Sequence, residues 1–255
     1  MAFYESAPMN FLRATFRLVS IVFVTAWFLI PLIIAQWLKG YSADRALQTR
    51  LRAAQPVVKL LGVKITLAGQ LPQGAFVFIG NHRSYFDPVV ALKFIKAFPV
   101  AKAEVQSWPL IGFAVKATGV LFVKRENKQS RKNALDGLTE FIKTGHSVLV
   151  YPEGTTTDLP KTVEFRRGAF QMASRGGFGI VPMAIEYKNP ADAWIGDDTF
   201  IPHFFRCFGK PVTEVKIAFG PALYGEDGEK LLREVQFWID SKLAEFRREW
   251  NLPLS

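Results

Sequence analysis

The sequence contains a single cysteine, Cys207, and only three histidines among its 255 residues. One cysteine excludes an internal disulfide and a cysteine-based metal cluster, and it is compatible with a reducing compartment. His146 and His203 have no metal-ligand neighbourhood, so the sequence predicts no metal site. Zinc-knuckle, RNA-recognition and basic-region heptad signatures are also absent, which argues against nucleic acid as a partner.

The chain also lacks the signatures of a covalent hydrolase. There is no G-x-S-x-G turn, and no serine or cysteine has the sequence context of an activated nucleophile. Internal repeats and low-complexity tracts are absent as well. With 255 residues, of which 49% are hydrophobic, the chain has enough material for one core.

Positive charge is in excess, because 32 Lys and Arg against 22 Asp and Glu give a formal net charge of +10. Such a balance indicates an anionic partner, which can be a nucleic acid, a membrane surface or a phosphorylated substrate. The 23 Phe and 6 Trp residues favour the membrane surface over nucleic acid.

One long segment, from Leu18 to Leu38, contains no charged residue and is long enough to span a bilayer core. A signal peptide is disfavoured because the run is too long and no small-residue cleavage site follows it. A single span with the catalytic domain inside is one alternative, because more cations follow the run than precede it. A helix buried in the protein core is another. The cations that follow are Lys39, Arg45, Arg50 and Arg52, and those that precede are Arg13 and Arg17.

The alternative we favour is a hairpin that dips into one leaflet, since Pro31 permits a kink and cations flank both ends. Ala43–Leu61 then follows as an amphipathic helix with apolar residues at helical spacing. We therefore expect residues 1–61 to form membrane-anchoring helices, residues 62–255 to form the catalytic domain, and that domain to face the cytoplasm, at the inner membrane if the protein is bacterial. The apolar positions are Leu47, Leu51, Ala54 and Val58.

From Gly62 onward the pattern alternates between short apolar runs and amphipathic segments. This alternation predicts an α/β domain with a mixed, mostly parallel sheet flanked by helices, in which ligands bind beyond the carboxyl ends of the strands. The expected strands are 63–68, 75–79, 100–103, 120–123, 147–150, 180–186 and 214–219, the expected helices are 88–97, 105–117, 129–143, 167–175 and 229–250, and 192–208 is expected to be a loop.

His82 and Asp87 follow the apolar run that ends at Gly80, in the segment Asn81-His82-Arg83-Ser84-Tyr85-Phe86-Asp87. Asp87-Pro88 is typical of a helix start, with Asp87 at the N-cap and Pro88 at the first helical position. A carboxylate that fixes the tautomer of an imidazole makes it a general base for a hydroxyl proton. The alternative is that Asp87 is only a cap and His82 only a turn residue.

Three further blocks follow in order: a strand ending Val123-Lys124-Arg125, the segment Tyr151-Pro152-Glu153-Gly154-Thr155, and the strand Ile180–Ile185. Together with N-H-x4-D, these blocks resemble the glycerolipid acyltransferases typified by 1-acylglycerol-3-phosphate acyltransferase. The resemblance covers roughly residues 62 to 220 and implies transfer of an acyl group from acyl-CoA or acyl-carrier protein to the free hydroxyl of a lysolipid. It implies no other cofactor.

The resemblance also implies roles for individual residues. His82 is the base and Asp87 orients it, while Arg125 holds the phosphate of the acceptor. Glu153 contacts the glycerol part of the acceptor, with a structural ion pair to an arginine as the alternative. The remaining expected contacts with substrate are Gly154, Thr155, Thr156, Arg166 and Arg167, and Val181, Pro182 and Met183 are expected to line the acyl slot or simply to be core.

Thr156 stands where many lysophosphatidate enzymes have an arginine, and Arg166 or Arg167 could replace that cation. The departure leaves the acceptor open. Lysophosphatidate, which would give phosphatidate, is the first expectation, and lyso-ornithine lipid or another lysophospholipid is the second. A non-catalytic membrane-binding protein of the same fold is the alternative from another class.

Overall fold

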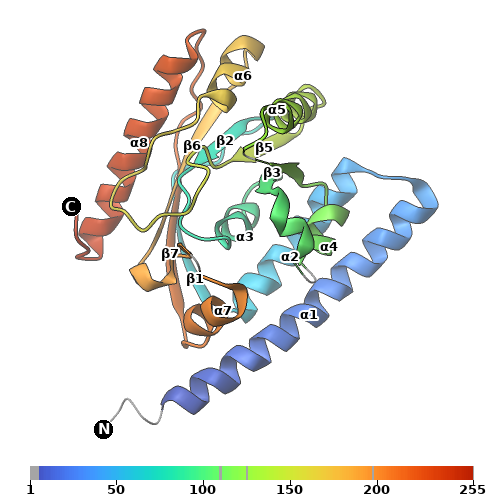
Figure 1. Cartoon of the computed structure of the whole chain (residues 1–255), viewed down its shortest axis with the longest axis vertical. Helices are drawn as coiled ribbons and strands as arrows, with labels where there is room; N and C mark the ends of the chain where they lie inside the picture. Colours follow the sequence, from blue (N-terminus) through green and yellow to red (C-terminus); the bar gives the residue numbers. More distant parts are fainter. Residues whose placement is uncertain (1–5, 109–110, 125, 197, 255) are drawn as a thin grey trace.

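The computed structural model describes residues 6–108, 111–124, 126–196 and 198–254. Within these residues the strands form one seven-stranded sheet in the order β1-β7-β6-β2-β5-β3-β4 (Figure 1). All neighbouring strands are parallel except β6 and β7, which confirms the predicted mixed, mostly parallel sheet. The strands are β1 (Val63–Ala68), β2 (Val77–Gly80), β3 (Ala97–Lys102), β4 (Leu121–Val123), β5 (Ser147–Val150), β6 (Ile180–Tyr187) and β7 (Thr213–Phe219).

Helices cover both faces of the sheet, which is why its central strands are apolar on both sides. In β2, Val77 and Ile79 pack in the core beneath α5, α6 and α8, whereas Phe78 packs in the core beneath α2, α3 and α7. The helices are α1 (Ser6–Lys39), α2 (Ala43–Leu60), α3 (Asp87–Leu92), α4 (Ile111–Ala117), α5 (Lys128–Lys143), α6 (Gly168–Gly176), α7 (Phe200–Phe208) and α8 (Gly228–Glu249), with 3-10 turns at η1 (Ala103–Ser107) and η2 (Pro190–Asp192).

Most boundaries agree with the sequence prediction to within a few residues, but three segments differ. The helix predicted over 88–97 ends at Leu92, and Ala97 already begins β3. The helix predicted over 105–117 is instead the 3-10 turn η1 followed by the shorter helix α4. The prediction of a loop over 192–208 was wrong, since this segment contains α7. Phe204 and Phe208 are buried one turn apart on that helix, so an apolar helical face was present in the sequence.

α1 is one continuous helix, and the predicted kink at Pro31 is not where the chain turns back. Pro31 removes one backbone hydrogen bond, but packing against α2 and α4 holds the helix on either side of it. The chain reverses just beyond α1, where Gly40 has a φ of +75° and the Ser42 hydroxyl accepts the N–H of Arg45. α1 and α2 therefore form the hairpin, and α1 has the length and composition of a membrane-spanning helix.

One face of α1 is fastened to the rest of the molecule near both of its ends. Near its start, Arg17 donates to the carbonyls of Phe208, Lys210 and Pro211 at distances of 2.6–2.9 Å, just beyond α7. Near its end, Gln36 donates to the carbonyl of Ala117 at 2.9 Å. The opposite face is an exposed apolar stripe with side chains one helical turn apart, formed by Leu12, Phe16, Val19, Phe23, Trp27, Ile30, Ile34 and Trp37.

We predict that Arg17→Met loosens this attachment, because it leaves carbonyls at the end of α7 without their charged donor. The loss should be about 1.5–3 kcal/mol in the free energy of unfolding, measured by thermal denaturation in detergent micelles. Arg52→Met, an exposed position on α2, is the matched control and should change stability little. Equal stability of the two variants would contradict the docking role of Arg17.

Candidate active site

His82 and Asp87 meet in the turn that connects β2 to α3. The Nδ1 atom of His82 lies 2.8 Å from Oδ2 of Asp87, and the two side chains are 8% and 0% exposed. A carboxylate accepts hydrogen bonds, so Nδ1 carries the proton and Nε2 presents its lone pair. The predicted contact between His82 and Asp87 is therefore present in the structure.

The Asp87 carboxylate also holds the turn itself. Its Oδ2 atom accepts the backbone N–H groups of Arg83 at 2.6 Å and Ser84 at 2.8 Å, and its Oδ1 atom accepts the hydroxyl of Tyr187 at 2.8 Å. These donors precede α3 or come from β6. The predicted N-cap role was wrong, because Phe86 occupies the N-cap position and Asp87 is the first residue of the helix.

Side chains tie the same turn to the end of β6. The amide of Asn81 exchanges two hydrogen bonds with the backbone of Ile185, at 2.9 and 2.8 Å. Tyr187, two residues further along β6, reaches Asp87 as described above. β2 pairs with β6 only as far as Gly80, so these side-chain bonds continue the attachment beyond the last backbone pair.

Glu153 supports His82 from the loop that follows β5. Its Oε1 atom accepts the backbone N–H of His82 at 2.7 Å, and its Oε2 atom accepts that of Val163 at 3.2 Å. Burial raises the pKa of Glu153, and these two backbone donors partly offset that effect. Both oxygens thus bind backbone, and within the described residues no ion pair joins Glu153 to Arg166 or Arg167.

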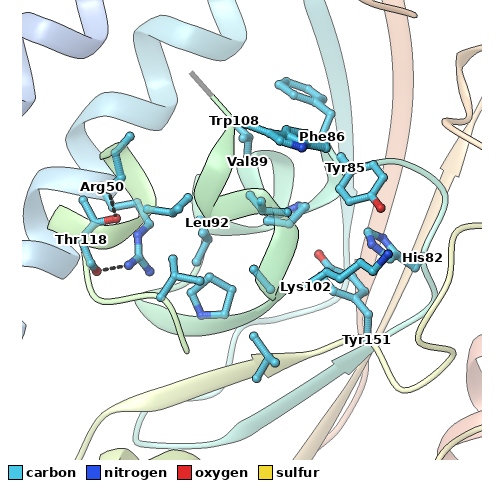
Figure 2. Close-up of a pocket in the computed structure, with 18 of the residues that line it drawn as sticks. Arg50, His82, Tyr85, Phe86, Val89, Leu92, Lys102, Trp108, Thr118 and Tyr151 are labelled. Atoms are coloured by element: carbon cyan, nitrogen blue, oxygen red, sulfur yellow. Dashed lines mark hydrogen bonds between the residues drawn. The ribbon is translucent and has the colours of Figure 1, made fainter. Parts of the chain in front are cut away.

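Aromatic rings surround the imidazole. The ring of Tyr151 stacks on that of His82 with centroids 4.3 Å apart, and Tyr85 lies edge-on at 6.1 Å. Burial raises the pKa of Tyr151 well above its usual value, so its hydroxyl stays protonated. Figure 2 shows these residues together with Lys102 at one end of the view and Arg50 with Thr118 at the other.

His82 lines a cavity of about 960 Å³. Apolar side chains from α1, α2, α3, β3 and α7 form most of its wall, so the N-terminal hairpin and the sheet domain share it. The apolar residues that line it include Leu18, Ile21, Phe28, Ala53, Val57, Phe86, Val89, Leu92, Val100 and Phe204.

Among the described residues, the cavity is lined by five Lys and Arg side chains and by no Asp or Glu; the five are Arg50, Lys102, Arg131, Arg166 and Arg167. Arg50 donates to the carbonyl of Ala97 at 2.7 Å and to that of Thr118, and burial lowers its pKa to about 10. The field in the cavity is therefore positive, which favours an anionic ligand.

The remaining predicted site residues fall into three groups. Gly154, Arg166 and Arg167 line the cavity, whereas Thr155 and Thr156 do not. Arg125 lies outside the described residues. Residues 181–183, which are expected to line the acyl slot or to be core, are buried in β6 and do not line this cavity.

Sequence reasoning missed Arg50, Lys102, Tyr151 and Tyr187 as site residues. Lys102 ends β3 and Tyr151 follows β5, so the rule that ligands lie beyond strand ends could have found both. Arg50 carried a weaker signal, as a cation among the apolar positions of an amphipathic helix. Nothing in the local sequence marks Tyr187, whose contact with Asp87 spans 100 residues.

Comparison with known proteins adds the family to this geometry. Residues 62–186, which include the turn after β2, the loop after β5 and β6, match the family model described as Acyltransferase. Residues 62–186 of this chain belong to the acyltransferase family.

Two curated acyltransferases illustrate the likeness. The chain is 27% identical over 183 residues to a lyso-ornithine lipid O-acyltransferase of Rhizobium meliloti, covering 64% of this chain and 63% of that protein. It is 32% identical over 152 residues to the enzyme of the same name from Pseudomonas aeruginosa, covering 57% and 58%. The chain thus spans about three fifths of the length of these relatives.

The same fold occurs in a solved acyltransferase. The crystal structure of the 1-acyl-sn-glycerophosphate (LPA) acyltransferase PlsC from Thermotoga maritima superimposes with a TM-score of 0.69. The match covers 97% of this chain and 98% of that chain at 19% identity. The likeness therefore extends beyond the family segment to the N-terminal helices and to α8.

We predict that Asp87→Asn keeps the turn but removes the charge that orients the His82 ring. The Asn carbonyl can still accept the N–H groups of Arg83 and Ser84, so the unfolding temperature should change by only a few degrees. Turnover should fall on the order of 10²–10⁴-fold, measured as the initial rate of acyl transfer at neutral pH. Near wild-type turnover would leave Asp87 with a structural role alone.

Proposed function

We propose that this protein is a membrane-associated acyltransferase that moves a fatty acyl group from a thioester donor to the free hydroxyl of a lysolipid. The observation that carries the proposal is the His82–Asp87 pair, held at 2.8 Å on the wall of a largely apolar cavity of about 960 Å³. Family membership supports the same reaction class.

The proposed chemistry needs one base. The acceptor hydroxyl donates to Nε2 of His82, which takes its proton while the hydroxyl oxygen attacks the carbonyl carbon of the thioester. The tetrahedral intermediate then expels the thiolate, which receives the proton and leaves as the free thiol. Asp87 stabilises the imidazolium that exists between these steps, so no covalent acyl-enzyme is required.

The acyl chain has room along β3, whose residues from Pro99 to Lys102 line the cavity. Lys102 lies at the His82 end, and Arg50 contacts Ala97 at the other end of the strand. The part of β3 that lines the cavity, from Pro99 to Lys102, spans about 10 Å at roughly 3.3 Å per residue. An extended chain of roughly eight carbons fits along that length, because each C–C bond of about 1.5 Å advances it by slightly less.

The geometry favours an acceptor with an anionic head group, and lysophosphatidate is the first candidate. Five cations and no carboxylate line the described cavity, an arrangement that suits a phosphate and offers no partner to an ammonium group. Lyso-ornithine lipid is the second candidate, because two relatives carry that substrate in their names and Thr156 replaces the usual arginine.

The donor in this proposal is acyl-CoA or acyl-carrier protein, and the membrane partner is a phospholipid surface. The docked face of α1 and its exposed apolar stripe support a helix that lies in one leaflet with the domain on the same side. The cations that flank the uncharged run favour the cytoplasmic face.

We predict that His82→Ala abolishes acyl transfer while the protein remains folded. Loss of the general base should lower turnover on the order of 10²–10⁴-fold, measured with a labelled acyl-CoA in the presence of lysolipid. Wild-type protein without lysolipid is the control, because release of free fatty acid there would indicate a hydrolase. Lack of transfer by the wild type with every donor and lysolipid would favour the non-catalytic alternative.

A second prediction separates the two acceptors. If the cations hold a phosphate, Arg166→Ala should raise KM for lysophosphatidate about tenfold and change KM for lyso-ornithine lipid much less, because a charge-assisted contact is lost. Arg175→Ala is the matched control, since it removes the same charge from an exposed position of α6 that does not line the cavity. The reverse preference would make lyso-ornithine lipid the leading acceptor.

A further inference from the structure

Behind the catalytic turn lies a group of buried charges that does not line the cavity. Arg83, 1% exposed, forms a fork with Glu186: its Nε atom lies 3.1 Å from Oε1 and its Nη2 atom 3.0 Å from Oε2. Its third nitrogen, Nη1, donates to the backbone oxygen of Thr157 at 3.1 Å and to its hydroxyl at 3.2 Å. One side chain thus connects the turn after β2, the end of β6 and the loop after β5.

Arg247 extends the group to the C-terminus of the chain. It is 4% exposed, and its Nη1 atom donates to Oε2 of Glu186 at 2.9 Å. Its Nε atom donates to the carbonyl of Pro253 at 2.6 Å, while the N–H of Leu252 returns to the carbonyl of Arg247 at 2.8 Å. The tail beyond α8 is therefore folded back onto the same arginine that holds Glu186.

Stability alone is a poor explanation for this arrangement. Two guanidinium groups and one carboxylate are removed from water, and the desolvation of such a group often exceeds its mutual attraction. Apolar side chains of similar volume would fill the space at no net loss. The group does, however, fix the position of Arg83 in three directions.

That position matters because Arg83 belongs to the turn that Asp87 holds. The backbone N–H of Arg83 donates to Oδ2 of Asp87 at 2.6 Å, a shorter distance than those from Ser84 and His82. Glu186 is followed directly by Tyr187, whose hydroxyl binds Oδ1 of the same carboxylate. A shift of Glu186 would therefore displace two donors of Asp87, and with them the carboxylate that orients His82.

We propose that Arg83, Glu186 and Arg247 are positioning residues, which transmit the placement of the end of α8 and of the C-terminal tail to the His82–Asp87 pair. This inference rests on the proposed function, in which His82 is the base. We therefore expect residues 247–253 to affect the catalytic rate, although they are remote in sequence from the turn after β2 and lie outside the cavity.

Arg247→Met tests the proposal in the full-length protein, because it leaves Glu186 paired with Arg83 and creates no lone buried charge. We expect kcat to fall about tenfold, as misplacement of a reacting group costs rate, while KM for donor and acceptor stays within about twofold. The acid limb of the pH–kcat profile should move to lower pH as the imidazolium loses its carboxylate. Simple removal of a nearby cation would move it to higher pH.

Lys242→Met is the matched control. Lys242 lies on α8 just before Arg247, is half-buried and pairs with Glu245 at 2.7 Å, and none of its bonds within the described residues reaches Glu186 or the turn. It should lower thermal stability without changing the pH profile. An equal fall of kcat in both variants would show general loosening of α8 and overturn the proposal.

An NMR measurement gives a readout that does not depend on activity. A downfield proton signal from Nδ1–H of His82 should be seen in the wild type and be weakened by faster exchange in Arg247→Met, but not in Lys242→Met. With three histidines in the chain, His146→Asn and His203→Asn suffice to assign it. An unchanged signal together with unchanged kcat would refute the positioning role.

A milder variant covers the case in which Arg247→Met does not fold. Ending the chain after Asn251 removes the Pro253 carbonyl and leaves Arg247 in place, and kcat should fall at least about threefold with the same change of pH profile. Wild-type activity in this truncated protein would overturn the role of the tail. Failure of the wild type to transfer acyl groups would instead refute the proposed function, while the NMR comparison would still test the positioning network.

Discussion

The structure depends most on the need to satisfy one fully buried carboxylate. Asp87 accepts hydrogen bonds from the backbone of Arg83 and Ser84, from the ring of His82 and from the hydroxyl of Tyr187. An unpaired charge at that depth would be very costly, so the four donors must arrive together. The shape of the turn, the tautomer of the imidazole and the end of β6 are therefore fixed by a single group, and the direction in which Nε2 points follows from them.

The sheet supplies the frame that brings these donors together. β2 lies between β5 and β6, so the turn after β2 is flanked by the loop after β5 and the last residues of β6. Glu153 reaches the backbone of His82 from the first of these, and Tyr187 reaches Asp87 from the second. Both oxygens of Glu153, which the sequence predicts to contact substrate, accept backbone N–H groups, so this side chain also supports the turn that carries His82.

Features that depend on neighbouring residues could be predicted from the sequence, whereas contacts between residues far apart in the sequence could not. The boundaries of β1 and β5 and the pairing of His82 with Asp87 followed from short patterns, because apolar runs and a five-residue spacing are visible without a fold. The contacts of Arg83 with Glu186 and of Arg50 with Ala97 span 103 and 47 residues, and no local pattern encodes them. The strand 181–183 was ambiguous for another reason, since a fully buried strand and a ligand-lining strand have the same apolar composition.

The position of α1 also bears on the proposed chemistry. One side of α1 contributes Leu18, Ile21 and Phe28 to the cavity wall, while the opposite side is an exposed apolar stripe. In the proposed reaction, a single helix therefore separates the acyl slot from the leaflet, so both lipid substrates can remain close to hydrocarbon as they approach His82. The proposed reaction also favours surroundings without water, because the cations that line the cavity interact most strongly with an anionic ligand where the dielectric constant is low. In this proposal, α1 both keeps the slot close to hydrocarbon and shields it from water. Arg17 and Gln36, which bind the rest of the protein, hold the helix in that position.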